Sequence, residues 1–293
     1  MKRTAGPSPL STYESSWPWS TTVSGASRVI VGVLAWWGGY STVARWSDPG
    51  RNNASGDTVD VTMSTLGIVG AGHIGSTVAR LAVDAGVDVV IANSRDPETL
   101  ADLVADLGPR ARAATAEEAA GAGDLVVLTV PLKALGDLPV AAFEGRVVLD
   151  TGNYYPQRDG RIADLDDGST TASELTARTL PGARVVKVFN NIFSEHLGAL
   201  ARPQAPAGSD ERSVLAIAGD DASAKQAATA LLDTIGYDVV DAGPLSEGWR
   251  FQPDTPAYGL PYDGSTDGTW SGSTAKRVGA EELRAALAAA TRG

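Results

Sequence analysis

The stretch Leu66-Gly-Ile-Val-Gly-Ala-Gly-His-Ile-Gly75 decides the fold of this chain of 293 residues. Its apolar start, at residues 66–69, is typical of a buried parallel strand that ends in glycine. The next six residues fit the pattern Gly-x-Gly-x-x-Gly, and an apolar helical face begins at Ile74. A strand, a glycine turn and a helix in this order predict a corner that binds the pyrophosphate of a dinucleotide.

Each glycine of this corner has its own expected role. Gly70 permits the tight turn, Gly72 lets the backbone approach the pyrophosphate, and Gly75 lets the helix pack against the strand. The helix N-terminus offers N–H groups and the positive end of its dipole to the phosphates. His73 and Ile74 complete the predicted loop, and His73 either contacts phosphate or ribose or faces solvent. The alternative is a glycine-rich turn that holds no ligand.

Strand-like and helix-like segments alternate beyond this corner. The pattern predicts strands over residues 66–69, 88–92, 112–114, 124–130, 146–150, 183–189, 213–218 and 237–241, and helices over 73–85, 97–107, 116–120, 222–235 and 280–290. This alternation predicts an α/β fold, a Rossmann doubly wound parallel sheet. We expect the later elements to extend the same sheet as a small C-terminal α/β extension, and residues 245–274 to form a long ordered loop.

The tip of the second predicted strand indicates which nucleotide binds. An NAD site usually places Asp or Glu here to bind the ribose 2′-hydroxyl. This chain has Asn93, Ser94 and Arg95 instead. A hydroxyl and a guanidinium bind a 2′-phosphate, which a carboxylate would repel. The tip therefore favours NADP(H), with all three residues in the site. The alternative is that Arg95 is a solvated charge and Asp96 binds the ribose.

Two further strand ends are candidate walls of the nucleotide site. Thr129, Val130 and Pro131 close the fourth predicted strand, and Asn153 follows the fifth. Ligands of doubly wound sheets lie outside the carboxyl ends of the strands. We therefore include these four residues among the cofactor contacts, with plain strand-to-loop junctions as the alternative. The neighbouring pair Tyr154-Tyr155 either stacks on a ring or packs the loop.

The composition excludes several classes of function. The chain has no cysteine and two histidines, so thiolate chemistry is excluded and we expect no metal site. A net charge of −11 argues against a nucleic-acid partner. No segment reaches the roughly 18 apolar residues of a membrane span, because the longest candidate is residues 29–40. We therefore expect a cytoplasmic protein without a membrane span.

The composition also changes near residue 62. The first 62 residues hold Trp17, Trp19, Trp36, Trp37 and Trp46, five of the seven tryptophans, without a sustained structural period. We expect an irregular or disordered extension over 1–62, an NADP-binding Rossmann domain over 63–180 and an α/β extension over 181–293 that completes the acceptor site. The first segment could instead come from a wrongly assigned start codon before Met63, or be an arm that touches a membrane or partner.

Several stretches resemble the NADPH-dependent oxidoreductases typified by the archaeal reductase of coenzyme F420, a deazaflavin. They are residues 66–75, 93–95, 130–131, 185–191, 219–221, 224–225 and 235–245. The reductase domain of the six-transmembrane metalloreductases is also similar, and there NADPH electrons pass through a flavin to a metal. The resemblance implies NADP(H) bound across residues 70–75, Ser94 and Arg95. It further implies a planar acceptor, coenzyme F420 or a flavin, stacked over the nicotinamide near Asn190.

The expected activity is hydride transfer between NADP(H) and such an acceptor. Lys187 and Asn190 are the candidate catalytic residues, with Asn191 beside them, and a strand-end cap with a solvated lysine is the alternative. His196 is expected to be structural, and residues 249–262 depart from the archaeal pattern. The partner is then a small-molecule redox acceptor, and a homodimer is compatible with this reading. A dehydrogenase of a small organic acid and a non-catalytic NADP sensor are the competing functions.

Overall fold

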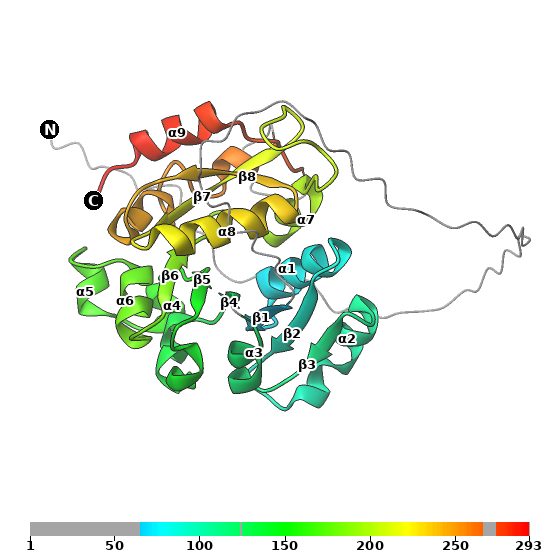
Figure 1. Ribbon diagram of the computed structural model, residues 1–293. Coiled ribbons are helices and arrows are strands. Elements are labelled where there is room, and N and C mark those ends of the chain that lie inside the picture. Colours follow the sequence, from blue (N-terminus) through cyan, green and yellow to red (C-terminus); the bar gives the residue numbers. More distant parts are fainter. Residues whose placement is uncertain (1–64, 124, 266–273, 293) are drawn as a thin grey trace, which may run out of the picture. The chain divides into compact units, whose positions relative to one another are not determined.

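The structure, a computed structural model, describes residues 65–123, 125–265 and 274–292. The extension expected over residues 1–62 lies outside the described residues. Within them, eight strands form one sheet in the order β3-β2-β1-β4-β5-β6-β7-β8 (Figure 1). The predicted Rossmann α/β fold is confirmed, including the small C-terminal extension.

The first six strands run parallel and carry the nucleotide-binding topology. They are β1 (Thr65–Val69), β2 (Asp88–Ala92), β3 (Ala111–Ala113), β4 (Leu125–Leu128), β5 (Val147–Asp150) and β6 (Arg184–Lys187). β4 and β5 are buried at every position, as expected for strands covered on both faces. The strand order reverses between β1 and β4, and such a switch point is where doubly wound sheets bind ligands.

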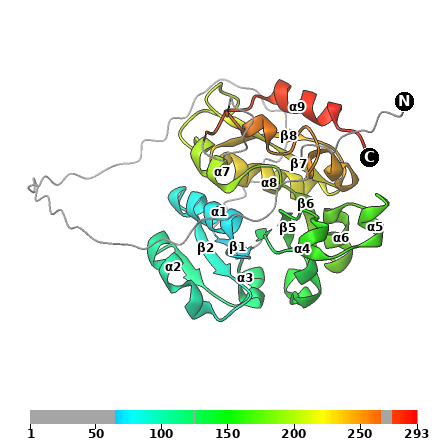
Figure 2. The same cartoon turned by 180° about the vertical axis from the view of Figure 1, so that it is seen from behind.

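Helices cover both faces of the sheet. One apolar cluster joins the sheet to α1 (His73–Asp84), α2 (Ala101–Leu107), α7 (Ser194–Leu200), α8 (Ala222–Thr234) and α9 (Ala280–Ala289). A second cluster joins the opposite face to α3 (Ala116–Ala122) and α6 (Ala172–Thr179). Figure 2 shows these two groups from behind. Neighbouring residues of β4 and of β5 enter different clusters, because side chains alternate along a strand.

The extension adds β7 (Ser213–Gly219) and β8 (Tyr237–Asp241) to the same sheet, as expected, but it reverses direction. β7 runs antiparallel to β6 and is joined to it by two residue pairs, Val186 with Gly219 and Lys187 with Ala218. β8 then runs parallel to β7. The sheet is therefore not parallel throughout. The connection after β6 delivers the chain to β7 at the carboxyl end of β6, whereas a parallel arrangement would need a crossover back along the sheet.

Several short elements were not expected from the sequence. They are α4 (Pro156–Asp159), α5 (Ala163–Asp166), α6 and α7, together with short 3₁₀ helices at Leu132–Asp137, Val140–Phe143, Leu245–Phe251 and Leu260–Tyr262. The helix expected over 97–107 is divided into a 3₁₀ turn, Pro97–Leu100, and α2. The loop expected over 245–274 is thus partly helical, and residues 266–273 lie outside the described residues. No helix in the described ranges is long and apolar enough to cross a membrane.

Candidate cofactor and acceptor site

The glycine corner after β1 has the shape that a dinucleotide site requires. Gly70 has a φ of +114°, and a β-carbon there would lie 2.5 Å from the carbonyl oxygen of Thr129. The Thr129 hydroxyl donates a hydrogen bond of 3.0 Å to the Gly70 carbonyl. A β-carbon at Gly72, in contrast, would meet no described atom within 4 Å. Gly70 is thus required by the turn, whereas Gly72 leaves its backbone open to a bound group.

The N-terminus of α1 provides the electrostatic part of this corner. Its N-cap, Gly72, makes no side-chain capping bond, and the first turn holds no acidic residue. The N-termini of α3, α6 and α8 are instead capped by Thr115, Thr171 and Asp221. Gly72 and His73 are exposed, while Ile74 is half-buried and packs on the core. An open, uncapped N-terminus of this kind fits an anionic group such as a pyrophosphate.

The loop after β2 presents the residues expected to bind the 2′-phosphate. Asn93 shapes it: its Oδ1 accepts a 2.8 Å hydrogen bond from the backbone N–H of Arg95, and its Nδ2 donates to the Thr99 hydroxyl at 2.9 Å. Ser94 and Arg95 are exposed beside this turn, and so is Asp96. The loop can therefore offer a hydroxyl and a guanidinium to an anion. Asp96 is also exposed and stays the alternative ligand of the ribose.

The remaining predicted contacts lie on the other side of the switch point. The half-buried residues Thr129, Val130 and Pro131 directly follow β4, and Asn153 follows β5. Neighbouring strands are about 4.8 Å apart, so the end of β5 lies about 10 Å from the glycine corner. A dinucleotide held at Gly72 would extend its adenosine half toward β2 and its nicotinamide half toward β4 and β5.

Lys187 occupies a buried polar network beneath the ends of β5 and β6. Its side chain is 1% exposed, and its Nζ donates to the Gly152 carbonyl at 2.8 Å and to the Ser173 hydroxyl at 3.2 Å. Ser173 donates to Asp150 at 2.6 Å, and Asp150 also accepts the Gly152 N–H at 3.1 Å. Burial lowers the pKa of Lys187 to about 8, while the nearby Asp150 raises it. Lys187 is therefore no solvated lysine, and the network fixes the backbone just before Asn153.

Asn190 joins the ends of β5 and β6 to a later part of the chain. Its Nδ2 donates to Asn153 Oδ1 at 3.1 Å and to the Phe251 carbonyl at 2.7 Å, and Asn153 Nδ2 donates back to the Asn190 carbonyl at 2.8 Å. The residue before it, Phe189, is buried with a φ of +62°, which is rare for a residue with a side chain. Asn190 is 5% exposed, and its Oδ1 has no hydrogen-bond partner among the described residues.

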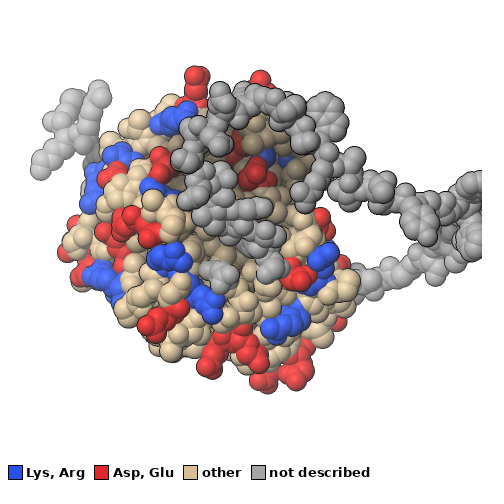
Figure 3. Space-filling model, in the orientation of Figure 1, with Lys and Arg blue, Asp and Glu red and all other residues tan. Residues whose placement is uncertain are grey.

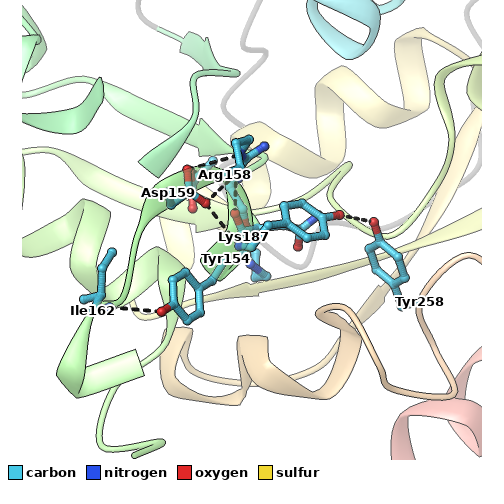
Figure 4. Close-up of polar contacts among 10 residues, drawn as sticks. Tyr154, Arg158, Asp159, Ile162, Lys187 and Tyr258 are labelled. Carbon is cyan, nitrogen blue, oxygen red and sulfur yellow. Dashed lines mark hydrogen bonds and ion pairs between the residues drawn. The ribbon is translucent and has the colours of Figure 1, made fainter. Parts of the chain in front are cut away.

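Two tyrosines meet above this network. The hydroxyls of Tyr155, in the loop after β5, and Tyr258 lie 2.5 Å apart, and both residues are half-buried. Arg158 places its guanidinium carbon 4.8 Å from the centre of the Tyr155 ring and donates to the Asn153 carbonyl at 2.7 Å. Figure 4 shows Tyr154 directed away, toward Ile162, whose N–H donates to the Tyr154 hydroxyl at 3.0 Å. The Tyr155 hydroxyl thus faces Tyr258, whereas the Tyr154 hydroxyl bonds Asp166 and Ile162.

The sequence did not reveal several members of this site. Ser173 lies on α6, and the signal that could have located this helix is the capping box Thr171-x-x-Glu174, in which both reciprocal bonds are present. Phe251 and Tyr258 lie in the segment expected to be a loop, and no local pattern links Tyr258 to Tyr155, 103 positions away. His196 lies in the core with its ring edge-on to Phe193. The described residues include no cluster of metal ligands.

Figure 3 shows acidic and basic side chains interspersed over one face of the molecule. Where that face is not covered by grey atoms, the basic side chains are separated by acidic and uncharged ones and form no continuous basic surface.

Comparisons with known proteins agree with this geometry. Residues 65–154 match the family described as NADP oxidoreductase, coenzyme F420-dependent. The F420-dependent NADP reductase of Methanothermobacter marburgensis is 33% identical over 205 residues, which cover 64% of this chain and 87% of that protein. The Escherichia coli K12 protein YjhV is 39% identical over 61 residues, which cover 21% of this chain and only 44% of that protein. A solved structure from Arthrobacter sp. FB24, a proposed F420-dependent NADP reductase, is 25% identical with a TM-score of 0.50, covering 62% and 85% of the two chains.

The fold, the glycine corner and these relatives define a Rossmann-fold oxidoreductase that depends on NADP. Within that class, the chain belongs to the family of coenzyme F420-dependent NADP oxidoreductases.

Proposed function

We propose that this protein transfers hydride between NADP(H) and a deazaflavin acceptor of the coenzyme F420 type. The observation that carries the proposal is the corner at Gly72, where an open backbone meets an uncapped helix N-terminus beside the exposed Ser94 and Arg95. The relative from Methanothermobacter marburgensis, named as an F420-dependent NADP reductase, supports the choice of acceptor. When bound, NADPH supplies the hydride from its nicotinamide ring.

The protein's own part in this reaction is placement and exclusion of water. Gly70, Gly72 and the N-terminus of α1 would hold the pyrophosphate, and Ser94 and Arg95 would hold the 2′-phosphate. The polar network under Asn153 would fix the wall beside the nicotinamide. Hydride transfer between two stacked rings needs position more than acid–base catalysis. Overall, one NADPH, one oxidised acceptor and one proton from water yield NADP⁺ and an acceptor reduced by two electrons.

The test is an acceptor screen with the full chain. The protein is mixed with NADPH, and the NADPH absorbance band is followed with a deazaflavin, with flavin mononucleotide and with a ferric chelate in turn. Oxidation with the deazaflavin at a rate well above that with the other two supports the proposal. Oxidation of NADPH by a small oxo acid or imine, tested in the same way, in preference to the deazaflavin would assign the protein to the organic-acid dehydrogenases. Binding of NADPH without turnover of any acceptor would indicate a sensor.

The cytoplasmic location, the homodimer and the absence of a nucleic-acid partner stay predictions from the sequence. The same holds for a flavin as acceptor and for the domain boundary at residue 180.

A further inference from the structure

We propose that the hydroxyl pair of Tyr155 and Tyr258 forms the acceptor-binding wall of the site and selects planar acceptors with a pyrimidine-dione edge, the chemistry that deazaflavins and flavins share. The proposal rests on the proposed function and names the part of the chain that would recognise the acceptor. Tyr258 is brought to the site by residues 252–259, which we call the strap.

The first support is the position of the pair. Tyr155 follows β5, and the strap lies against the residues that follow β6, because the Asn191 side chain donates to the Ala257 carbonyl at 2.9 Å and the Gly259 N–H donates to the Asn191 carbonyl at 2.9 Å. Both phenols thus converge on the carboxyl ends of β5 and β6. This is the side of the switch point toward which the nicotinamide half of a dinucleotide would extend. An acceptor stacked on that ring would meet the pair.

The second support is the chemistry of the groups gathered there. A dione edge presents carbonyl, N–H and carbonyl in sequence, so it needs a donor, an acceptor and a donor. Phenol hydroxyls can donate and accept, and their rings offer faces for stacking. Asn190 Oδ1, buried and without a partner among the described residues, is suited to receive an N–H. Its amide orientation is fixed, since Nδ2 already donates to Asn153 and to the Phe251 carbonyl.

The third support is electrostatic. A ring that has accepted hydride carries negative charge on its dione edge until it takes a proton from water. Arg158 lies beside the Tyr155 ring and is bonded to Asp159 at 2.9 and 3.0 Å, so this ion pair, with its cationic end toward the ring, would face that edge. Burial raises the pKa of both Tyr155 and Tyr258, so each phenol keeps its proton. One hydroxyl of the pair donates to the other, so the pair would stabilise the charge by donating its remaining O–H and would not act as the source of the proton.

The chain offers a matched control for the test. Tyr154 is adjacent to Tyr155, but its hydroxyl accepts from the Ile162 N–H and donates to Asp166 at 2.8 Å, away from the strap. Tyr155→Phe, Tyr258→Phe and Tyr154→Phe each remove one oxygen atom and keep the ring. Folding is verified by thermal unfolding and by NADPH binding in a calorimeter, and Tyr258→His, which retains a hydrogen-bonding group, serves as a second variant if Tyr258→Phe does not fold.

The readouts are the KM and kcat for a deazaflavin and for flavin mononucleotide, and the affinity of each oxidised ring measured directly in the presence of NADP⁺. We expect Tyr155→Phe and Tyr258→Phe to weaken both rings roughly tenfold, the usual effect of one lost hydrogen bond. NADPH affinity should stay within about twofold, and Tyr154→Phe should behave as the original protein. A loss with the deazaflavin alone would still place the pair at the acceptor and would identify the deazaflavin as its ligand.

Two results would overturn the inference. One is unchanged ring affinity and unchanged KM in both variants of the pair; the proposed function would then stand if the original protein still oxidised NADPH with the deazaflavin. The other is an equal loss of NADPH affinity, which would place the pair on the cofactor side. If the original protein turned over no acceptor, the proposed function would fail, while the direct binding measurement would still judge the tyrosine pair.

Discussion

Gly75 lies so close to Gly70 that a β-carbon added to Gly75 would stand 1.9 Å from the Gly70 carbonyl oxygen. The helix can start where it does only because the third glycine of the corner has no side chain. Gly72, between them, has open space at the same position and a φ of −79°, which any residue can adopt. The same motif therefore contains glycines required by packing and a glycine that packing does not require.

This difference gives the first prediction. Gly75→Ala should destabilise the fold by several kcal/mol, because the added methyl group meets backbone that cannot move aside. Gly72→Ala should unfold at nearly the original temperature but bind NADPH at least tenfold more weakly, because its methyl group fills the approach to the pyrophosphate. Thermal unfolding and calorimetric titration measure the two effects. Unchanged NADPH affinity in Gly72→Ala would place the phosphates elsewhere.

The second prediction concerns Arg95. Arg95→Ala should weaken NADPH by about tenfold to a hundredfold and leave NADH nearly unchanged, because only NADPH carries the 2′-phosphate that a charge-assisted bond would hold. Arg110→Ala, a surface arginine paired with Asp88, is the control. Equal weakening of both nucleotides by Arg95→Ala would remove the argument for NADP. A loss of NADH binding in Asp96→Ala would favour the carboxylate as the ribose ligand.

A third prediction distinguishes the effect of α6 on acceptor turnover from its effect on the stability of the fold. Thr171→Ala and Thr115→Ala each remove a capping box, and each should cost about 1 kcal/mol in the free energy of unfolding. Only α6 carries Ser173, which bonds Asp150 and Lys187. We therefore expect Thr171→Ala to lower acceptor turnover more than Thr115→Ala at equal loss of stability. Equal turnover in the two variants would show that the network tolerates movement of α6.

The fourth prediction follows from the buried ammonium of Lys187. Its pKa is about 8 in the folded protein, against 10.5 for an unperturbed lysine. Between these values the unfolded chain binds more protons than the folded one, so this group makes the free energy of unfolding rise with pH. The stability of the original protein relative to Lys187→Met should thus increase between pH 7 and pH 10, by up to about 3 kcal/mol.

Urea unfolding of both proteins at several pH values checks this prediction. Burial raises the pKa of Tyr237 and Tyr262, but these groups affect both proteins alike, so the comparison isolates Lys187. A difference between the two proteins that stays constant with pH would mean that Lys187 titrates as an exposed lysine does.

The nucleotide-binding half of the fold could be predicted because its signals are local. Val126, Val127 and their neighbours in β4 form a continuous apolar run, which is typical of a strand buried on both faces. The glycine pattern then fixed the position of the corner within that sheet. The reversal of β7 relative to β6 carried no such signal, since an apolar strand has the same composition in either direction.

The candidate site was less predictable, because its contacts are not local in the sequence. Lys187 and Asn190 could be selected because they lie in and just after one apolar strand, yet the burial of Lys187 depends on Ser173, Asp150 and a helix that was not expected. The contact between Tyr155 and Tyr258 joins two segments that lie far apart in the sequence. No pattern in either segment indicates this contact, because it depends on how the strap folds. Residues that act through distant partners were therefore found only in the structure.

The short pairing between β6 and β7 has a consequence for how the protein unfolds. Only two residue pairs join these strands, and one of them contains Lys187, whose Nζ bonds Gly152 and Ser173 in the nucleotide-binding half and lies 5.9 Å from the centre of the Phe251 ring in the extension. So few backbone pairs would hold the two halves weakly by themselves, although one apolar cluster also spans this boundary. The buried ammonium of Lys187 contacts residues of both halves, so unfolding of either half would leave it without its partners. We therefore expect the two halves to unfold in a single cooperative transition.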